Sequence, residues 1–142
     1  MSSYPHPSPE APAALRGRSR TLPWAVFVAY ASFILGVVWI MDTGRGQLVQ
    51  DFVATHAHSD KLAHCVLMGT LCLLLNIALA APTVHILNRP VLQGSLWLGG
   101  IIVLEELSQL FVAHRTFDLL DLLSDFVGIV IAGVITRRLV EA

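Results

Sequence analysis

Four apolar runs, each about long enough to cross a bilayer, constrain this chain more than any other feature of its sequence. They cover residues 22–41, 62–81, 91–112 and 119–135. A helix needs about 20 apolar residues to span the roughly 30 Å of hydrocarbon in a membrane. Inside hydrocarbon the backbone must satisfy its own hydrogen bonds, which favours helices. We therefore expect an all-α integral membrane bundle of four transmembrane helices, the last over about residues 118–136.

The overall composition agrees with a membrane protein. Hydrophobic residues make up 55% of the chain and charged residues only 13%, whereas a soluble domain carries about 25% charged residues. The sequence holds no glycine-rich phosphate-binding loop and no nucleophile motif, and nothing in it favours a nucleic-acid partner. We therefore expect an integral membrane protein without a cofactor.

Residues 1–21 differ from the rest of the chain in composition. They contain four prolines and three arginines but little apolar surface, which predicts a disordered basic tail. The apolar run that follows also has features of a signal peptide, whose apolar region is about 7–15 residues long. The apolar run over residues 22–41 is longer than that. Asp42 follows it directly, without a small-residue cleavage site, so we expect a retained helix. Residues 22–138 then form one transmembrane domain.

Basic residues beside the apolar runs predict the orientation, because Lys and Arg are enriched in cytoplasmic loops. If the amino terminus is inside, six basic residues flank the inner side: Arg16, Arg18, Arg20, Arg89, Arg137 and Arg138. Three flank the outer side: Arg45, Lys61 and Arg115. This asymmetry favours an N-in, C-in, multi-pass protein of a bacterial inner (cytoplasmic) membrane.

In this topology a group of polar residues falls at one outer membrane level: Asp60, Lys61, His64, Glu105, Glu106, Gln109, Arg115, Asp118, Asp121 and Asp125. The pairs Asp60–His64 and Asp121–Asp125 are spaced i, i+4, so each shares one helix face. A charged side chain inside a membrane costs roughly 3 kcal/mol on insertion scales. So many at one level predict a polar cavity between helices, open to the outer side.

The order of these residues resembles the VanZ-like family. The pattern is Asp60-Lys61-x-x-His64, Glu106-x-x-Gln109, Arg115, Asp121 and Gly128, within about residues 60–135. That family consists of small membrane proteins named for a member associated with resistance to the glycopeptide teicoplanin. The resemblance implies a cell-envelope protein linked to antibiotic resistance. One position departs from the pattern, because this chain has Asp125 where the family usually has Asn.

The charges suggest roles within the cavity. Lys61 and Arg115 are expected to bind an anionic group. Two further ligand residues lie at the same level, Asp60 and Gln109. The candidates for acid–base catalysis, if a reaction occurs at all, are His64, Glu106, Asp121 and Asp125.

Structural interpretations stand beside these roles. Asp60 and Asp118 each precede an apolar run and are suited to cap a helix. Arg115 can neutralise buried carboxylates, and His64 can hydrogen-bond Glu106 across helices. We also weigh a pairing of Glu105 with Lys61.

Histidines and cysteines give no metal or disulfide signal. The histidines near Asp60 lack the tight spacing of a metal site, so no metal is expected: His56, His58 and His64. On a helix, Cys65 and Cys72 lie about 10 Å apart, which is too far for a disulfide. Both are expected to be packing residues.

The sequence leaves three functions open. We expect the cavity to bind or act on a membrane lipid headgroup or a lipid-linked cell-wall precursor. A non-enzymatic scaffold of an envelope complex is the first alternative. A proton or ion relay within an oligomer is the second, and it needs another polar layer, which only Asn76 and Ser95 offer.

Overall fold

The structure, a computed structural model, describes residues 21–43, 45–46, 57–111 and 118–141. Four α-helices make up most of these residues: α1 (Thr21–Asp42), α3 (Ala57–Leu79), α4 (Gln93–Ser108) and α5 (Leu119–Glu141). A 3₁₀ turn, η2 (Gln109–Phe111), continues α4. Strands β1 (Thr83–Ile86) and β2 (Arg89–Leu92) form an antiparallel hairpin between α3 and α4. The predicted basic tail lies outside the described residues, except for Thr21.

The helices follow the apolar runs, with shifts at their ends. Of the predicted third helix over residues 91–112, α4 covers residues 93–108, and α5 continues to Glu141, beyond the predicted end at 136. The second helix was predicted to begin at Leu62, but α3 begins at Ala57. Its first turn is polar and therefore carries no hydrophobic signal. Two alanines with positive φ follow the end of α3, Ala80 at 65° and Ala81 at 51°. A residue with left-handed backbone cannot continue a right-handed helix, so α3 ends here. The conformation costs an L-residue roughly 1–2 kcal/mol.

The hairpin is the main departure from an all-α fold. Residues 82–90 lie between two of the apolar runs, yet Val84 pairs with Val91 in a regular antiparallel register. The two residues between the strands, Leu87 and Asn88, have φ of 49° and 61°. Positive φ at both central residues is the geometry of a type I′ turn, which fits the twist of a hairpin. Because this turn lacks the usual glycine, only Asn88 points to a turn at this position in the sequence.

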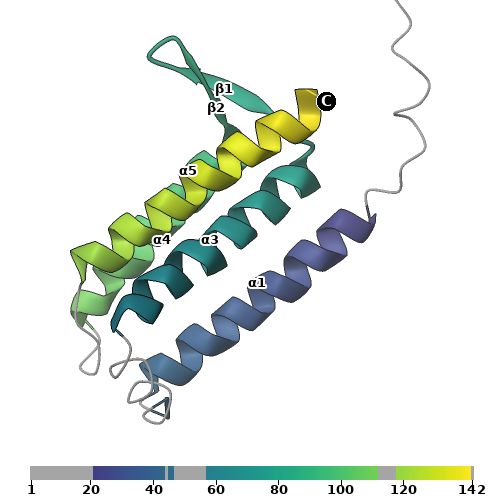
Figure 1. Cartoon of the computed structure of the whole chain (residues 1–142). Coiled ribbons are helices and arrows are strands. Elements are labelled where there is room, and N and C mark those ends of the chain that lie inside the picture. Colours follow the sequence, from purple (N-terminus) through teal and green to yellow (C-terminus); the bar gives the residue numbers. More distant parts are fainter. Residues whose placement is uncertain (1–20, 44, 47–56, 112–117, 142) are drawn as a thin grey trace, which may run out of the picture.

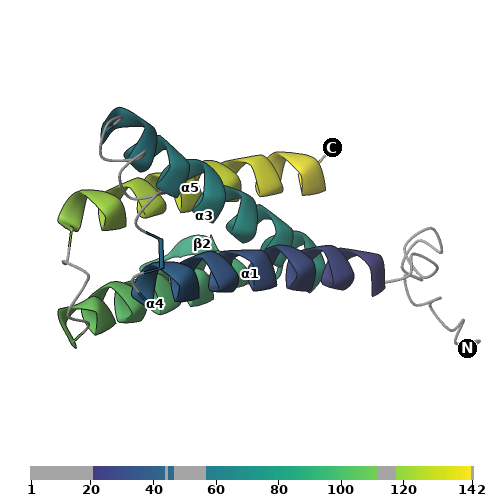
Figure 2. The ribbon, with the colours of Figure 1, turned by 90° about the horizontal axis from the view of Figure 1, so that it is seen from below.

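The helices run in alternating directions (Figures 1 and 2). Helices α3 and α5 form the closest pair, α1 packs on α3, and α4 packs on both α3 and α5. The hydroxyl of Tyr30 in α1 donates to the Leu67 carbonyl in α3 at 3.3 Å. Because the helices alternate in direction, α3 and α5 begin at the end of the bundle where α1 and α4 finish. The hairpin lies toward the opposite end, beside the last turns of α5 (Figure 1).

The bundle is apolar on its outside. Large side chains such as Leu35, Leu104 and Val130 are more than half exposed, while a core of apolar residues around Cys72, Leu98 and Ile129 is buried. Among the described residues, three helices are long and apolar enough to cross a membrane: Thr21–Met41, Asp60–Leu79 and Leu119–Glu141. Helix α4 is shorter, with 16 residues. These properties are those of a multi-pass membrane protein.

Candidate functional site

Charged side chains from α3 and α5 meet at the end of the bundle where both helices begin. Contacts link Asp60, Lys61 and His64 of α3 to Asp118, Asp121 and Asp125 at the start of α5. The carboxylate of Glu106 in α4 joins them through the backbone N–H of Asp118. We call these seven residues the polar cluster. Arg115, which was predicted to belong to the same site, lies outside the described residues.

Lys61 is the hub of the polar cluster. Its Nζ lies 2.7 Å from Asp118 Oδ2 and 2.5 Å from Asp121 Oδ1, and 3.3 Å from Asp60 Oδ2. An ammonium group has three donors, so each can face one carboxylate. The anion-binding role of Lys61 stays a prediction, and an incoming anion would have to compete with these three partners.

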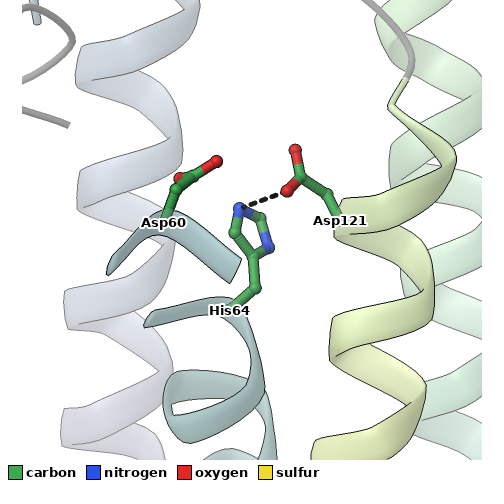
Figure 3. Close-up of side chains that lie close together, drawn as sticks. All are labelled: Asp60, His64 and Asp121. Carbon is green, nitrogen blue, oxygen red and sulfur yellow. Dashed lines mark ion pairs between the residues drawn. The ribbon is translucent and has the colours of Figure 1, made fainter. Parts of the chain in front are cut away.

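His64 connects a partly exposed and a buried carboxylate. Its Nδ1 lies 3.1 Å from Asp125 Oδ1, and its Nε2 lies 3.7 Å from Asp121 Oδ1. The side chain of Asp125 is only 5% exposed, compared with 28% for His64. Figure 3 shows the ring of His64 between Asp60 and Asp121. The interhelical partner of His64 is therefore Asp125, whereas Glu106 was the partner considered from the sequence.

A close crossing of α3 and α5 sets this geometry. A Cβ added to Gly128 would lie 2.2 Å from the carbonyl oxygen of Cys65, and one added to Gly69 would lie 3.0 Å from the carbonyl oxygen of Gly128. Cys65 follows His64 in the chain, and Gly128 comes about one turn after Asp125. Glycine therefore lets the backbones approach where the imidazole must reach the carboxylate.

The two acidic residues near the end of α4, Glu105 and Glu106, contact different partners. Glu106 is 2% exposed, and its Oε1 accepts the backbone N–H of Asp118 at 2.7 Å. Gln109 is also buried, but its Nε2 donates to both carboxylate oxygens of Glu105, at 3.0 and 3.1 Å. Gln109, a predicted ligand residue, is thus engaged by Glu105.

The two predicted helix caps have different outcomes. Oδ1 of Asp118 accepts the backbone N–H of Leu120 at 2.8 Å, so its capping of α5 is confirmed. The cap at Asp60 is wrong, because α3 already begins at Ala57 and Asp60 lies in its first turn. Hydrogen bonds from Lys61 and from the Leu120 backbone hold the pKa of Asp118 below its usual range.

The polar cluster carries more acidic than basic groups. Its described members comprise five carboxyl groups, those of Asp60, Glu106, Asp118, Asp121 and Asp125, and one ammonium. Carboxylates as close together as the three that share Lys61 repel one another strongly unless a cation or proton neutralises them. The site therefore attracts cationic groups and protons more readily than it attracts anions.

Three members of the polar cluster could hold a metal ion. One ligand atom each of Asp60, His64 and Asp121 lies within 4.8 Å of the others. Lys61 already donates to Asp121 and contacts Asp60, so an ion would have to displace its ammonium. The side chains of His56 and His58, also weighed as ligands, lie outside the described part of the structure.

A second, uncharged polar layer lies deeper in the bundle. Nδ2 of the fully buried Asn76 donates to Ser95 Oγ at 3.0 Å and lies 3.4 Å from Cys72 Sγ. Within the described residues its Oδ1 has no hydrogen-bond partner, and a Cβ at Gly94 would lie 2.5 Å from this oxygen. Asn76 and Ser95 were recognised from the sequence, but Cys72 was expected only to pack. Its i, i+4 spacing from Asn76 was the available signal.

Comparisons with known proteins give no name to this arrangement. No protein-family model, no curated protein and no solved structure matches the chain. The resemblance to the VanZ-like family therefore stays a prediction that depends on the spacing of the polar residues.

Proposed function

We propose that this chain is a VanZ-like protein of the bacterial inner membrane whose polar cluster binds a zwitterionic, amine-bearing headgroup. That headgroup belongs to a membrane lipid or to a lipid-linked cell-wall precursor. One observation carries the proposal: charged side chains of α3, α4 and α5 gather at one end of a bundle whose outer surface is apolar. The ends of such a bundle meet the lipid headgroups.

Four crossings and an outward-facing site complete the proposal. The 16 residues of α4 and the 3 residues of η2 rise about 24 Å and about 6 Å, respectively. Together they match the roughly 30 Å of hydrocarbon. An even number of crossings leaves both termini on one side, and the basic flanks favour the cytoplasmic side. The polar cluster then faces the outer leaflet, where lipid-linked precursors are used.

The charges of the site favour an amine over a lone phosphate. Three carboxylates already surround the ammonium of Lys61, so a phosphate approaching Lys61 would meet their repulsion. A primary amine could instead share Asp60 and Asp121 with Lys61, because each carboxylate has two oxygens and both side chains are partly exposed. By resemblance to the VanZ-like pattern, Arg115 would hold the phosphate of the same headgroup.

The pair His64–Asp125 gives the site a means of moving a proton. A buried carboxylate that holds one imidazole nitrogen orients the ring and stabilises its protonated form. The other nitrogen, Nε2, is then directed toward Asp121 and the partly exposed side of the cluster. If the bound headgroup is also chemically changed, His64 is the general base that we propose.

A non-enzymatic scaffold is the second candidate, and Lys61 is the observation that favours it. Its contacts with Asp118 and Asp121 tie α3 to α5. Glu106 adds a tie between α4 and the start of α5. Under this interpretation the polar cluster only holds the helices in register while the apolar surface contacts a larger envelope complex.

Lipid binding by the purified full-length chain separates the two candidates. We would compare phosphatidylethanolamine with phosphatidylcholine, whose quaternary amine has no N–H donor. We expect preferential binding of phosphatidylethanolamine, and an approximately tenfold weaker preference in Asp121→Asn, the size of one charge-assisted hydrogen bond. The matched control is Glu141→Gln, which neutralises an exposed acid at the other end of α5.

Two results would favour the scaffold. One is equal binding of both lipids by the wild type. The other is an Asp121→Asn variant that loses thermal stability but keeps the lipid preference. In cells, we expect a deletion strain and a His64→Ala strain to share an altered profile of envelope lipids and cell-wall precursors. A profile that neither change alters would contradict the proposed function.

A further inference from the structure

An apolar groove runs between α4 and α5, and no residue of the polar cluster lines it. It encloses about 830 Å³, and its walls include Leu96, Gly99 and Gly100 of α4 and Phe126 and Gly133 of α5. Its rim carries exposed leucine and valine side chains, Leu104 and Val130 among them. The groove is therefore open toward the lipid that surrounds the bundle.

Small residues create the groove. A Cβ added to Gly100 would meet no atom within 4 Å, and one added to Gly133 would meet nothing closer than 3.7 Å. Glycine at these positions is thus not required by contacts within the chain. What the glycines leave is space on the outer surface, where a long flexible chain could lie.

The length of the groove matches one leaflet of a bilayer. From Phe126 to Arg137, both of which line it, α5 rises about 16 Å. Half of the hydrocarbon thickness is about 15 Å. An acyl chain of a single leaflet would therefore fill the groove along its length.

The groove ends at a cationic group. The guanidinium of Arg137, which lines the groove, donates to the carbonyl oxygen of Pro90 in the hairpin. A guanidinium has five N–H donors, so this contact positions the group and leaves donors for a further partner. Arg89 in β2 and Arg138 in the last turn of α5 are exposed as well. Because the hairpin lies beside the last turns of α5 (Figure 1), both add positive charge near Arg137.

We propose that this groove binds a glycerophospholipid with an anionic headgroup, with one acyl chain between α4 and α5 and the phosphate on Arg137. Guanidinium groups bind phosphate through two parallel hydrogen bonds. Basic residues at the membrane surface also attract anionic lipids. This inference rests on the chain crossing a membrane, and it does not depend on the ligand of the polar cluster.

Native mass spectrometry of the purified full-length chain tests the inference. We would titrate it with phosphatidylglycerol or phosphatidylcholine of identical acyl chains and compare the lipid retained. We expect the wild type to retain phosphatidylglycerol preferentially. In Arg137→Gln, the ratio of phosphatidylglycerol to phosphatidylcholine retained should fall about tenfold. The charge control is Arg138→Gln, which removes a neighbouring arginine that does not line the groove.

A variant that fills the groove tests the acyl-chain site independently of Arg137. Gly100→Leu should reduce retention of both lipids, because its side chain occupies the space of the acyl chain. The control is Gly36→Leu on α1, since Gly36 is also exposed and a Cβ there also meets no atom within 4 Å. Both variants should fold, as thermal unfolding would verify.

Three results would overturn the inference. The first is equal retention of the two lipids by the wild type. The second is an Arg138→Gln variant as impaired as Arg137→Gln, which would indicate a diffuse charge effect. The third is a dimer that Gly100→Leu dissociates, because a second copy of the chain would then occupy the groove. Asp121→Asn should leave phosphatidylglycerol retention unchanged, so this test and that of the polar cluster can fail separately.

Discussion

The polar cluster and the layer around Asn76 both lie between helices, but they differ in charge and depth. The cluster consists of ionisable groups at the start of α3 and α5 and the end of α4, whereas the deeper layer contains only an amide, a hydroxyl and a thiol. From His64 to Asn76, α3 rises about 18 Å, which is more than half of the roughly 30 Å of hydrocarbon.

This difference shows how the bundle meets the cost of polar groups in a membrane. Most of the ionisable groups are partly exposed, and each contacts the ammonium of Lys61, the imidazole of His64 or a backbone donor. At depth, neutral groups bond to one another and carry no net charge. An ion costs far more than an amide in hydrocarbon, so the same chain uses different chemistry at the two levels.

The largest expected effect comes from changing the close crossing that holds the polar cluster together. Gly128→Ala places a Cβ 2.2 Å from the Cys65 carbonyl oxygen, so the helices must separate and the pair His64–Asp125 must lengthen. Overpacking of this kind costs roughly 1–3 kcal/mol. Reversible unfolding in mixed micelles should show that loss, while Gly133→Ala, which meets only ordinary contacts, should remain near the wild type. Equal stabilities would mean that the crossing does not constrain the cluster.

Removing the ammonium from the polar cluster should have the next largest effect. Lys61→Met leaves Asp60, Asp118 and Asp121 without their shared cation. Because these groups are partly exposed, we expect a loss of about 1–2 kcal/mol, between the values of exposed and buried ion pairs. The same unfolding measurement would detect it. Arg138→Met, at the exposed end of α5, serves as the comparison, and a loss of equal size there would remove any special role for Lys61.

The neutral layer should tolerate change better than the charged one. Asn76→Leu removes the bonds to Ser95 and Cys72 but also the carbonyl oxygen that has no partner among the described residues. Interhelical hydrogen bonds in membranes average about 0.6 kcal/mol, and we expect a loss of that size or less. A loss greater than that of Lys61→Met would reverse the contrast between the two layers.

The pH dependence of Asp118 should be the smallest effect. Its pKa is lowered in the folded protein because Lys61 donates to it, whereas the unfolded value is about 3.9. Its contribution to stability is thus fully present above about pH 4 and is lost as the pH falls through the lower, folded pKa. Unfolding midpoints of the wild type and Asp118→Asn should converge as the pH falls from 5 to 3. A constant difference would show that the pairing does not depend on ionisation.

Spacing along the sequence predicted the members of the site better than their partners. The i, i+4 pairs placed His64 and Asp125 on helix faces that do meet. Their contact depends on how α3 and α5 are rotated against each other, which spacing within one helix does not specify. The alternative partner, Glu106, instead bonds the backbone of Asp118. Likewise, the contacts of Lys61 join the first turns of α3 to the start of α5, and the polar first turn of α3 carried no apolar signal.

The sequence by itself determined that this chain has apolar helices of membrane-spanning length, because the thickness of hydrocarbon and the need to satisfy the backbone leave few other structures for such runs. It also predicted that the seven residues of the polar cluster lie at the same end of the bundle. The tertiary structure alone decided the pairing His64–Asp125, the hub at Lys61, the hairpin and the groove beside Arg137. The hairpin depends on a two-residue turn without the usual glycine, while the other three depend on contacts between helices. For the pair His64–Asp125, the close approach of Gly128 to α3 matters most.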